Sequence, residues 1–69
     1  MHIESTKHAK EQMKERNISE DDVISTIKYA EKTNKIHNVY YARKNIGRAF
    51  IEVVYIIEKY IKVITVYPL

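Results

Sequence analysis

The residues best suited to chemistry near the start of the chain lie at helical spacing. His8, Gln12 and Arg16 follow one another at intervals of four, so on a helix of about 100° per residue they share one stripe. Chemistry at a phosphate group needs an acid, a base and a cation for the charge that develops on phosphorus. His8 would serve as acid or base, and Arg16 would bind the phosphate. The structural alternative places His8 at a helix end and pairs Arg16 with Glu20 or Glu52.

A second candidate pair lies at strand spacing near the end of the chain. Thr65 and Tyr67 alternate with apolar residues and would share one strand face with Ile61 and Val63. Together with His8 and Arg16 they make the candidate catalytic set, provided that the first helix packs across this face. The alternative is again structural, since threonine is a common strand residue and Tyr67 would then close the core.

The excess positive charge lies in the second half of the chain. Residues 1–35 carry seven basic and seven acidic side chains, whereas residues 36–69 carry five basic and two acidic ones. Three of these cations, Arg43, Lys44 and Arg48, lie close together, and Tyr41 precedes them. Cations beside an aromatic ring would bind phosphates and stack bases, so these four residues are the candidate nucleic-acid-binding set. They would equally suit a solvated hairpin tip.

Neither a metal nor another cofactor is expected. The chain has no cysteine, which excludes iron–sulfur clusters and thiolate zinc sites. Its three histidines, His2, His8 and His37, lack the spacing of metal ligands.

Two helices are expected in the first half of the chain. Residues 5–16 are rich in helix formers behind a Ser5 or Thr6 cap, and Asn17 would end this helix. The second helix would begin at Ser19, with Asp22 closing a capping box, and would end within residues 30–32. Ile18 and Val23 would form a hydrophobic staple across its start.

In the second half of the chain, apolar and polar residues alternate with the period of two that is typical of strands. We expect strands over residues 36–43, 48–57 and 60–67, joined by a turn at 44–47 and a short connection at 58–59. Short connections predict an antiparallel meander. The predicted fold is therefore α+β, with two N-terminal helices followed by a three-stranded antiparallel sheet (α-α-β-β-β), in a single domain over residues 1–69. Two helices cannot cover both faces of such a sheet, so a homodimer is one expected partner arrangement.

Composition fits a globular domain. The chain has 69 residues, of which 45% are hydrophobic and 30% charged. Its longest apolar run, residues 53–57, is too short to span a membrane. We expect a cytoplasmic protein with no membrane partner.

Residues 8–19 carry a resemblance to a known family. They read His-Ala-Lys-Glu-Gln-Met-Lys-Glu-Arg-Asn-Ile-Ser, and residues 64–67 read Ile-Thr-Val-Tyr. This resembles an uncharacterised small-domain family with an Arg-Ile-Ser-Glu-type motif, whose members read His-Ala-x-x-Arg-Met-x-x-Arg-Gly-Ile-Ser and end on Val-Thr-Val-Tyr. Asn17 and Gln12 stand where that pattern has glycine and arginine.

In layout the family is similar to the RelE and BrnT toxins. That likeness implies a RelE-like fold and a metal-independent endoribonuclease of a toxin–antitoxin system, with RNA as substrate and an antitoxin protein as partner. If the family's arginine binds phosphate, Gln12 would weaken or remove the activity. Two other classes stay open: a non-enzymatic module that binds nucleic acid or protein, and a small dimeric interaction domain.

Overall fold

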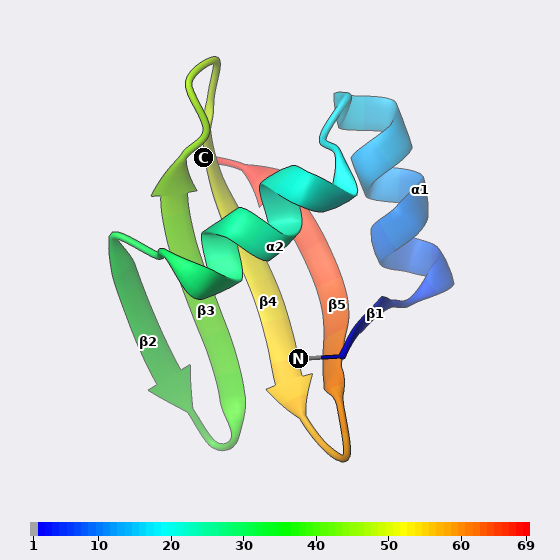
Figure 1. Cartoon of the computed structure of the whole chain (residues 1–69), viewed down its shortest axis with the longest axis vertical. Helices are drawn as coiled ribbons and strands as arrows, with labels where there is room; N and C mark the ends of the chain where they lie inside the picture. The colour runs from blue at the N-terminus through cyan, green and yellow to red at the C-terminus, as the bar shows by residue number, and fades with distance from the viewer. Residues whose placement is uncertain (1) are drawn as a thin grey trace.

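The computed structural model describes residues 2–69, and its strands form one five-stranded sheet (Figure 1). The elements are β1 (Ile3–Ser5), α1 (Lys7–Arg16), α2 (Glu20–Lys28), β2 (Lys32–Ile36), β3 (Val39–Asn45), β4 (Phe50–Ile57) and β5 (Ile61–Pro68). The strand order is β1-β5-β4-β3-β2. β1 pairs with β5 in parallel, and the other neighbours are antiparallel. The α+β class holds, but the predicted three-stranded antiparallel meander is wrong.

The first difference from the predicted fold is a hairpin in place of one strand. The segment predicted as a strand over residues 36–43 contains a two-residue turn at His37 and Asn38, which separates β2 from β3. Both turn residues have positive φ, 50° and 70°, as the type I′ turn of a tight hairpin requires. Asparagine and histidine tolerate this conformation better than most residues, so a hairpin forms here without glycine.

The second error concerns the N-terminus. Residues 3–5 form β1, which pairs in parallel with residues 61–63 of β5. Parallel neighbours need a long crossover, and nearly the whole chain provides it here. A three-residue strand carries too little alternation to be detected in the sequence.

The helix signals, in contrast, are confirmed. Thr6 is the N-cap of α1, and its hydroxyl accepts a hydrogen bond from the Ala9 amide at 3.1 Å. Asn17 ends α1 in the left-handed conformation, with φ 55°. At the start of α2 the Ser19 hydroxyl accepts from the Asp22 amide and the Asp22 carboxylate accepts from the Ser19 amide, both at 3.0 Å. α2 ends at Lys28, two residues before the predicted range.

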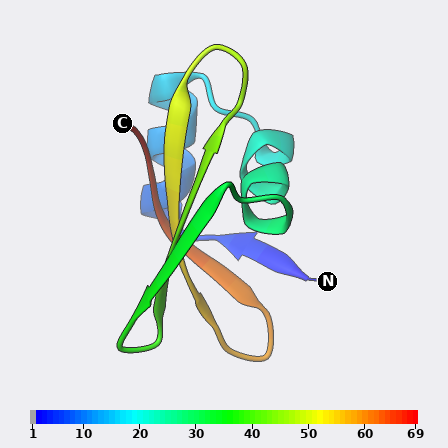
Figure 2. The same cartoon turned by 90° about the vertical axis from the view of Figure 1, so that its left-hand side faces the viewer.

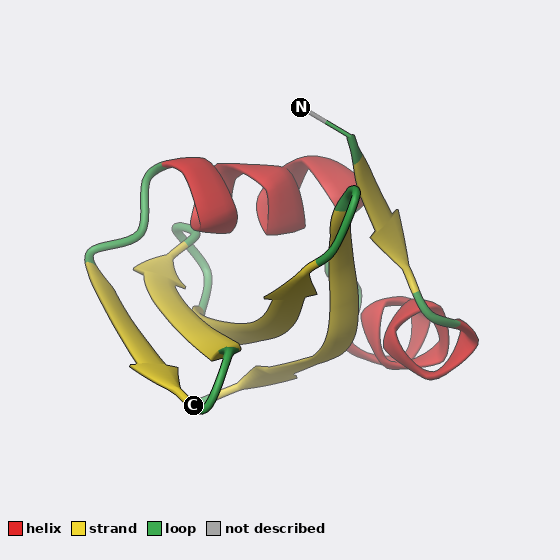
Figure 3. Cartoon of the chain, turned by 90° about the horizontal axis from the view of Figure 1, so that it is seen from below, coloured by secondary structure: helices red, strands yellow, loops and turns green. Residues whose placement is uncertain are grey.

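The two helices cover one face of the sheet and one of its edges. α2 lies across β3 and β4, and α1 runs beside β5 (Figures 1 and 3). The core between them contains Ala9 and Met13 from α1, Val23 from α2, and the inward side chains of the central strands, among them Ala42, Ile51, Val53, Val63 and Val66. The strands twist strongly against one another (Figure 2).

A β-bulge in β5 changes which side chains share a face. Val63 pairs with Tyr55 and Thr65 pairs with Val54, so Ile64 is an extra residue. Beyond the bulge the alternation is reversed. Thr65 and Tyr67 therefore face away from the core, opposite Ile61 and Val63, and the expectation that all four share one face is wrong.

We call the sheet face opposite α2 the open face. Ladder register and side-chain alternation place on it Lys32, Asn34, Ile36, Val39, Tyr41, Arg43, Asn45, Phe50, Glu52, Val54, Ile56, Lys62, Thr65 and Tyr67. Within residues 2–69 no helix lies across this face.

Candidate functional site

A row of polar side chains crosses the open face from β3 to β5. Arg43, Glu52 and Tyr67 are direct cross-strand neighbours in the ladders. The Nε of Arg43 donates to Oε2 of Glu52 at 2.6 Å, and the Tyr67 hydroxyl donates to Oε1 of the same carboxylate. Glu52 is only 4% exposed, and each of its carboxylate oxygens accepts a hydrogen bond from a side chain on the same face of the sheet.

This arrangement fixes the protonation states of the row. Burial raises the pKa of Glu52, but the hydrogen bonds from Tyr67 and Arg43 and the Arg43 charge lower it below its usual value of 4.5. The hydrogen bond to Glu52, together with burial and the Glu52 charge, raises the pKa of Tyr67 to about 12. Near neutral pH, Glu52 is therefore an anion and Tyr67 a proton donor to it. Neither group is ready to exchange a proton at that pH.

Arg43 still has free hydrogen-bond donors after it has bound Glu52. Its side chain is 41% exposed, and its Nε atom makes the bond to Glu52. The two Nη groups make no hydrogen bond to any residue from 2 to 69. Since a guanidinium group has five N–H donors, Arg43 can hold Glu52 and an external oxyanion together.

Gln12 joins α1 to the neighbouring row of the open face. Its Oε1 accepts from the Thr65 hydroxyl at 2.5 Å and from the Val66 amide at 2.9 Å. The Val66 amide points away from β4 toward α1, where no strand is available to accept it. Gln12 thus supplies the acceptor that a neighbouring strand would otherwise supply to this part of β5. The same contact holds the Gln12 side of α1 against Thr65.

His8 and Arg16 lie one turn on either side of Gln12 on that stripe. Both are exposed, and neither makes a side-chain hydrogen bond or ion pair with another residue of the described range. α1 and β5 run in the same direction, so Arg16 lies toward the Tyr67 end of β5 (Figure 1). The structure therefore groups Thr65 with Gln12, and Tyr67 with Arg43 through Glu52. It leaves His8 and Arg16 as free groups at the border of the open face.

The three cations of the predicted basic patch point to different places. Arg43 lies on the open face, and Lys44 lies on the opposite face by alternation. Arg48 belongs to the β3–β4 loop and donates to the Asn17 carbonyl at 2.6 Å and to Asp22 at 2.8 Å. It therefore ties this loop to the connection between the helices. Hydrogen bonds from the Ser19 backbone and from Arg48 lower the pKa of Asp22.

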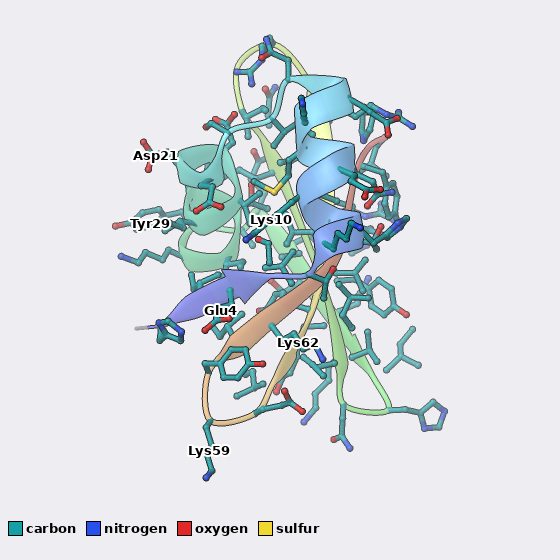
Figure 4. All side chains as sticks on the ribbon, turned by 90° about the vertical axis from the view of Figure 1, so that its right-hand side faces the viewer. Glu4, Lys10, Asp21, Tyr29, Lys59 and Lys62 are labelled. Atoms are coloured by element: carbon teal, nitrogen blue, oxygen red, sulfur yellow. The ribbon has the colours of Figure 1, made fainter. Side chains whose placement is uncertain are left out.

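Other side chains of the open face supply aromatic rings and charge. Tyr41 is half-buried beside Tyr67, and Phe50 is 40% exposed. Lys32 is the cross-strand neighbour of Arg43, and Lys62 lies at the opposite end of the face, toward the β4–β5 turn (Figure 4). Glu52 is the one carboxylate among the open-face residues of the described range, and Arg43 neutralises it. The face is therefore aromatic and positively charged.

Sequence reasoning did not assign Glu52, Phe50 or Lys32 to a site. Glu52 interrupts an otherwise apolar strand, and a buried carboxylate nearly always has a partner. That signal would have identified it. Lys32 and Phe50 become neighbours of the site only through the register of β2, β3 and β4, which the missed hairpin concealed.

A family comparison covers almost all of the chain. The sequence model of a family described as Domain of unknown function (DUF4258) matches residues 5–68. The chain belongs to this family. The expectation of an uncharacterised small-domain family is thus confirmed for the DUF4258 domain, and its family description assigns no activity. Searches of curated proteins and of solved structures gave no match.

Two further observations describe residues 2–69 of the DUF4258 domain. No helix in this range is long and apolar enough to cross a membrane. The same residues contain no group of three or more histidine, cysteine or acidic side chains arranged to hold a metal ion.

Proposed function

We propose that the DUF4258 domain binds single-stranded RNA through its open face. The observation that carries this proposal is the meeting of Tyr41, Phe50 and Tyr67 with Arg43 and its free guanidinium donors on one uncovered sheet face. Unpaired bases stack on aromatic side chains, and cations between the rings hold the phosphates.

The charge on this face supports an anionic ligand. Three cations, Lys32, Arg43 and Lys62, face the same side as the rings, and the carboxylate of Glu52 is buried and paired. Arg16 lies at the C-terminal end of α1, which runs beside β5. An RNA strand crossing from β5 to β2 would meet cations along its path and no uncompensated carboxylate.

RNA cleavage is the second candidate, favoured by the placement of His8 on the same α1 stripe as Gln12, which contacts Thr65. Its imidazole would act as acid or base, and Arg16 would stabilise the phosphate charge. Tyr67, with a pKa of about 12, would donate a hydrogen bond rather than exchange a proton. This reading extends the likeness to the RelE and BrnT toxins, in which case an antitoxin protein would be a further partner.

The binding proposal is tested with a labelled single-stranded RNA oligonucleotide by fluorescence anisotropy over a range of salt concentrations. With about three phosphates neutralised, the slope of log K against log salt should be close to −2. The double variant Lys32→Gln, Lys62→Gln should bind more weakly and reduce that slope to about −0.7. The control, Lys28→Gln with Lys44→Gln, removes equal charge away from the open face and should leave the slope unchanged.

Equal losses in the two double variants would show that binding is not localised to the open face, and the absence of binding by the parent would refute the proposal. Cleavage is tested on the same RNA with a chelator present. His8→Ala should abolish cleavage and retain binding, because His8 is exposed and lies outside the open-face residues. Cleavage that persists in His8→Ala would exclude the histidine role.

A further inference from the structure

The two lateral edges of the sheet differ in how their backbone groups are satisfied. On the β5 side, β1 pairs with residues 61–63, the Thr6 amide and hydroxyl donate to the Val63 and Ile64 carbonyls, and Gln12 accepts from the Val66 amide. Pro68 ends β5 with no amide hydrogen to satisfy. β1 itself has only three residues, too few to attract another strand.

The β2 side has no such protection. All five residues of β2 are exposed, its register with β3 is continuous, and it contains no proline. The turn at His37 and Asn38 makes Ile36 and Val39 a hydrogen-bonded pair, so the backbone groups of Thr33 and Lys35 point outward. Within the described residues no element pairs with this edge. It is a free template for one more strand.

The charge of β2 selects among the strands that could pair with it. It carries Lys32 and Lys35 and no carboxylate. Pairing with the β2 of a second copy would bring four lysines and no carboxylate into one short ladder, and the repulsion between these charges disfavours that pair. An acidic strand would instead place its carboxylates against them. Ile36, which is 55% exposed at the end of β2, adds an apolar contact for such a strand.

We propose that the free edge of β2 binds an extended acidic segment of a partner protein by strand addition. Backbone hydrogen bonds to Thr33 and Lys35 would provide the pairing, and the two lysines would provide the selection for acidic sequence. This edge lies beside the open face and shares Lys32 with it, but the outward backbone groups of Thr33 and Lys35 do not contribute to that face.

The probe is a blocked peptide of about seven residues that carries glutamates on both faces of the strand, with valines between them, because Lys32 and Lys35 lie on opposite faces of the sheet. It is titrated into the ¹⁵N-labelled full chain. The amide signals of Thr33 and Lys35 should shift and their hydrogen exchange should slow by about tenfold or more. The same peptide with lysine in place of glutamate should leave both unchanged. Thr33→Pro removes one outward donor without removing a bond to β3, so this variant should stay folded and lose the response.

Three results would overturn the proposal. The first is no change at Thr33 and Lys35 at millimolar peptide. The second is an equal response to the lysine peptide, or a response that survives in Thr33→Pro. The third is concentration-dependent dimerisation of the parent that protects the same two amides, which would make a second copy the occupant. RNA binding measured on Thr33→Pro should equal that of the parent, so the failure of one proposal is distinguishable from failure of the other.

Discussion

Replacing Glu52 with glutamine should lower the free energy of unfolding by about 1–3 kcal/mol at pH 7. Glutamine has nearly the size of glutamate and keeps one acceptor oxygen, so the packing of the 4% exposed side chain is preserved. What is lost is the charge-assisted bond from Arg43 at 2.6 Å, and Arg43 and Tyr67 then compete for one acceptor. Because Arg43 is 41% exposed, water can solvate its freed guanidinium. The loss therefore stays below the roughly 3–5 kcal/mol expected for breaking a fully buried pair.

The effect should depend on pH with a defined sign. The folded protein holds the pKa of Glu52 below its usual value of 4.5, so the folded state binds fewer protons than the unfolded state. The stabilisation from this carboxylate is fully present above about pH 4.5 and is lost as the pH falls through the folded-state pKa. Tyr67 has the opposite sign. Its pKa is raised from 10.0 to about 12, so its contribution is present below pH 10 and is lost as the pH rises toward 12.

Urea unfolding followed by far-ultraviolet circular dichroism at pH 3, 5 and 7 measures how the Glu52 contribution to stability changes at acid pH. The difference between the parent and Glu52→Gln should be large at pH 7 and 5 and should shrink at pH 3. Glu58→Gln, an exposed carboxylate in the β4–β5 turn, is the matched control and should change stability little at any pH. A Glu52→Gln penalty that is equal at pH 3 and pH 7 would refute the electrostatic reasoning, and an unchanged midpoint at pH 7 would refute the hydrogen-bonded row itself.

Three further substitutions test elements that hold the site in place, each by the midpoint of urea unfolding. Ser19→Ala removes half of the capping box and should cost about 0.5–2 kcal/mol; an unchanged midpoint would show that the box does not stabilise α2. Gln12→Arg should cost about 1–3 kcal/mol, because arginine cannot accept the bond from the Val66 amide; a neutral effect would mean that water replaces it. His37→Val should cost about 1–2 kcal/mol at φ 50°, whereas His37→Asn should be tolerated; equal effects would argue against the left-handed turn.

The helices were predictable because their signals are local. The capping box at Ser19, the cap at Thr6 and the stop at Asn17 each depend on residues within one turn of the chain, and each is found where it was expected. The α+β class followed from the same local patterns. Strand boundaries near residues 44–61 were also close, since turn residues and β-branched runs mark them.

The errors have a common physical origin in long-range pairing. β1 forms because residues 61–63 of β5 lie beside it, and nothing in three residues reveals that partner. The β2–β3 hairpin has no glycine, so the turn at His37 and Asn38 reads as part of a continuous strand. The bulge at Ile64 reverses the alternation without a sequence marker and moves Thr65 and Tyr67 to the open face.

The site residues show the same contrast between local signals, which the sequence reveals, and long-range contacts, which it does not. Thr65 and Tyr67 were identified as a pair on one strand face, and the structure keeps them together there. Their partners were not predictable by local reasoning, because Gln12 reaches Thr65 across 53 residues of sequence and Tyr67 reaches Glu52 across 15. A site built from cross-strand neighbours can be read only after the register is known.

Gln12 connects the family resemblance with the structure. The resemblance drawn from the sequence would place arginine at this position, where a guanidinium group would add donors and a charge to the stripe of α1 beside β5. Glutamine supplies an acceptor instead, and it uses that acceptor on the Thr65 hydroxyl and the Val66 amide. Gln12 therefore closes the β5 edge beside Thr65 and Val66. The cations of the proposed RNA contact, Arg43, Lys32 and Lys62, lie instead on the open face.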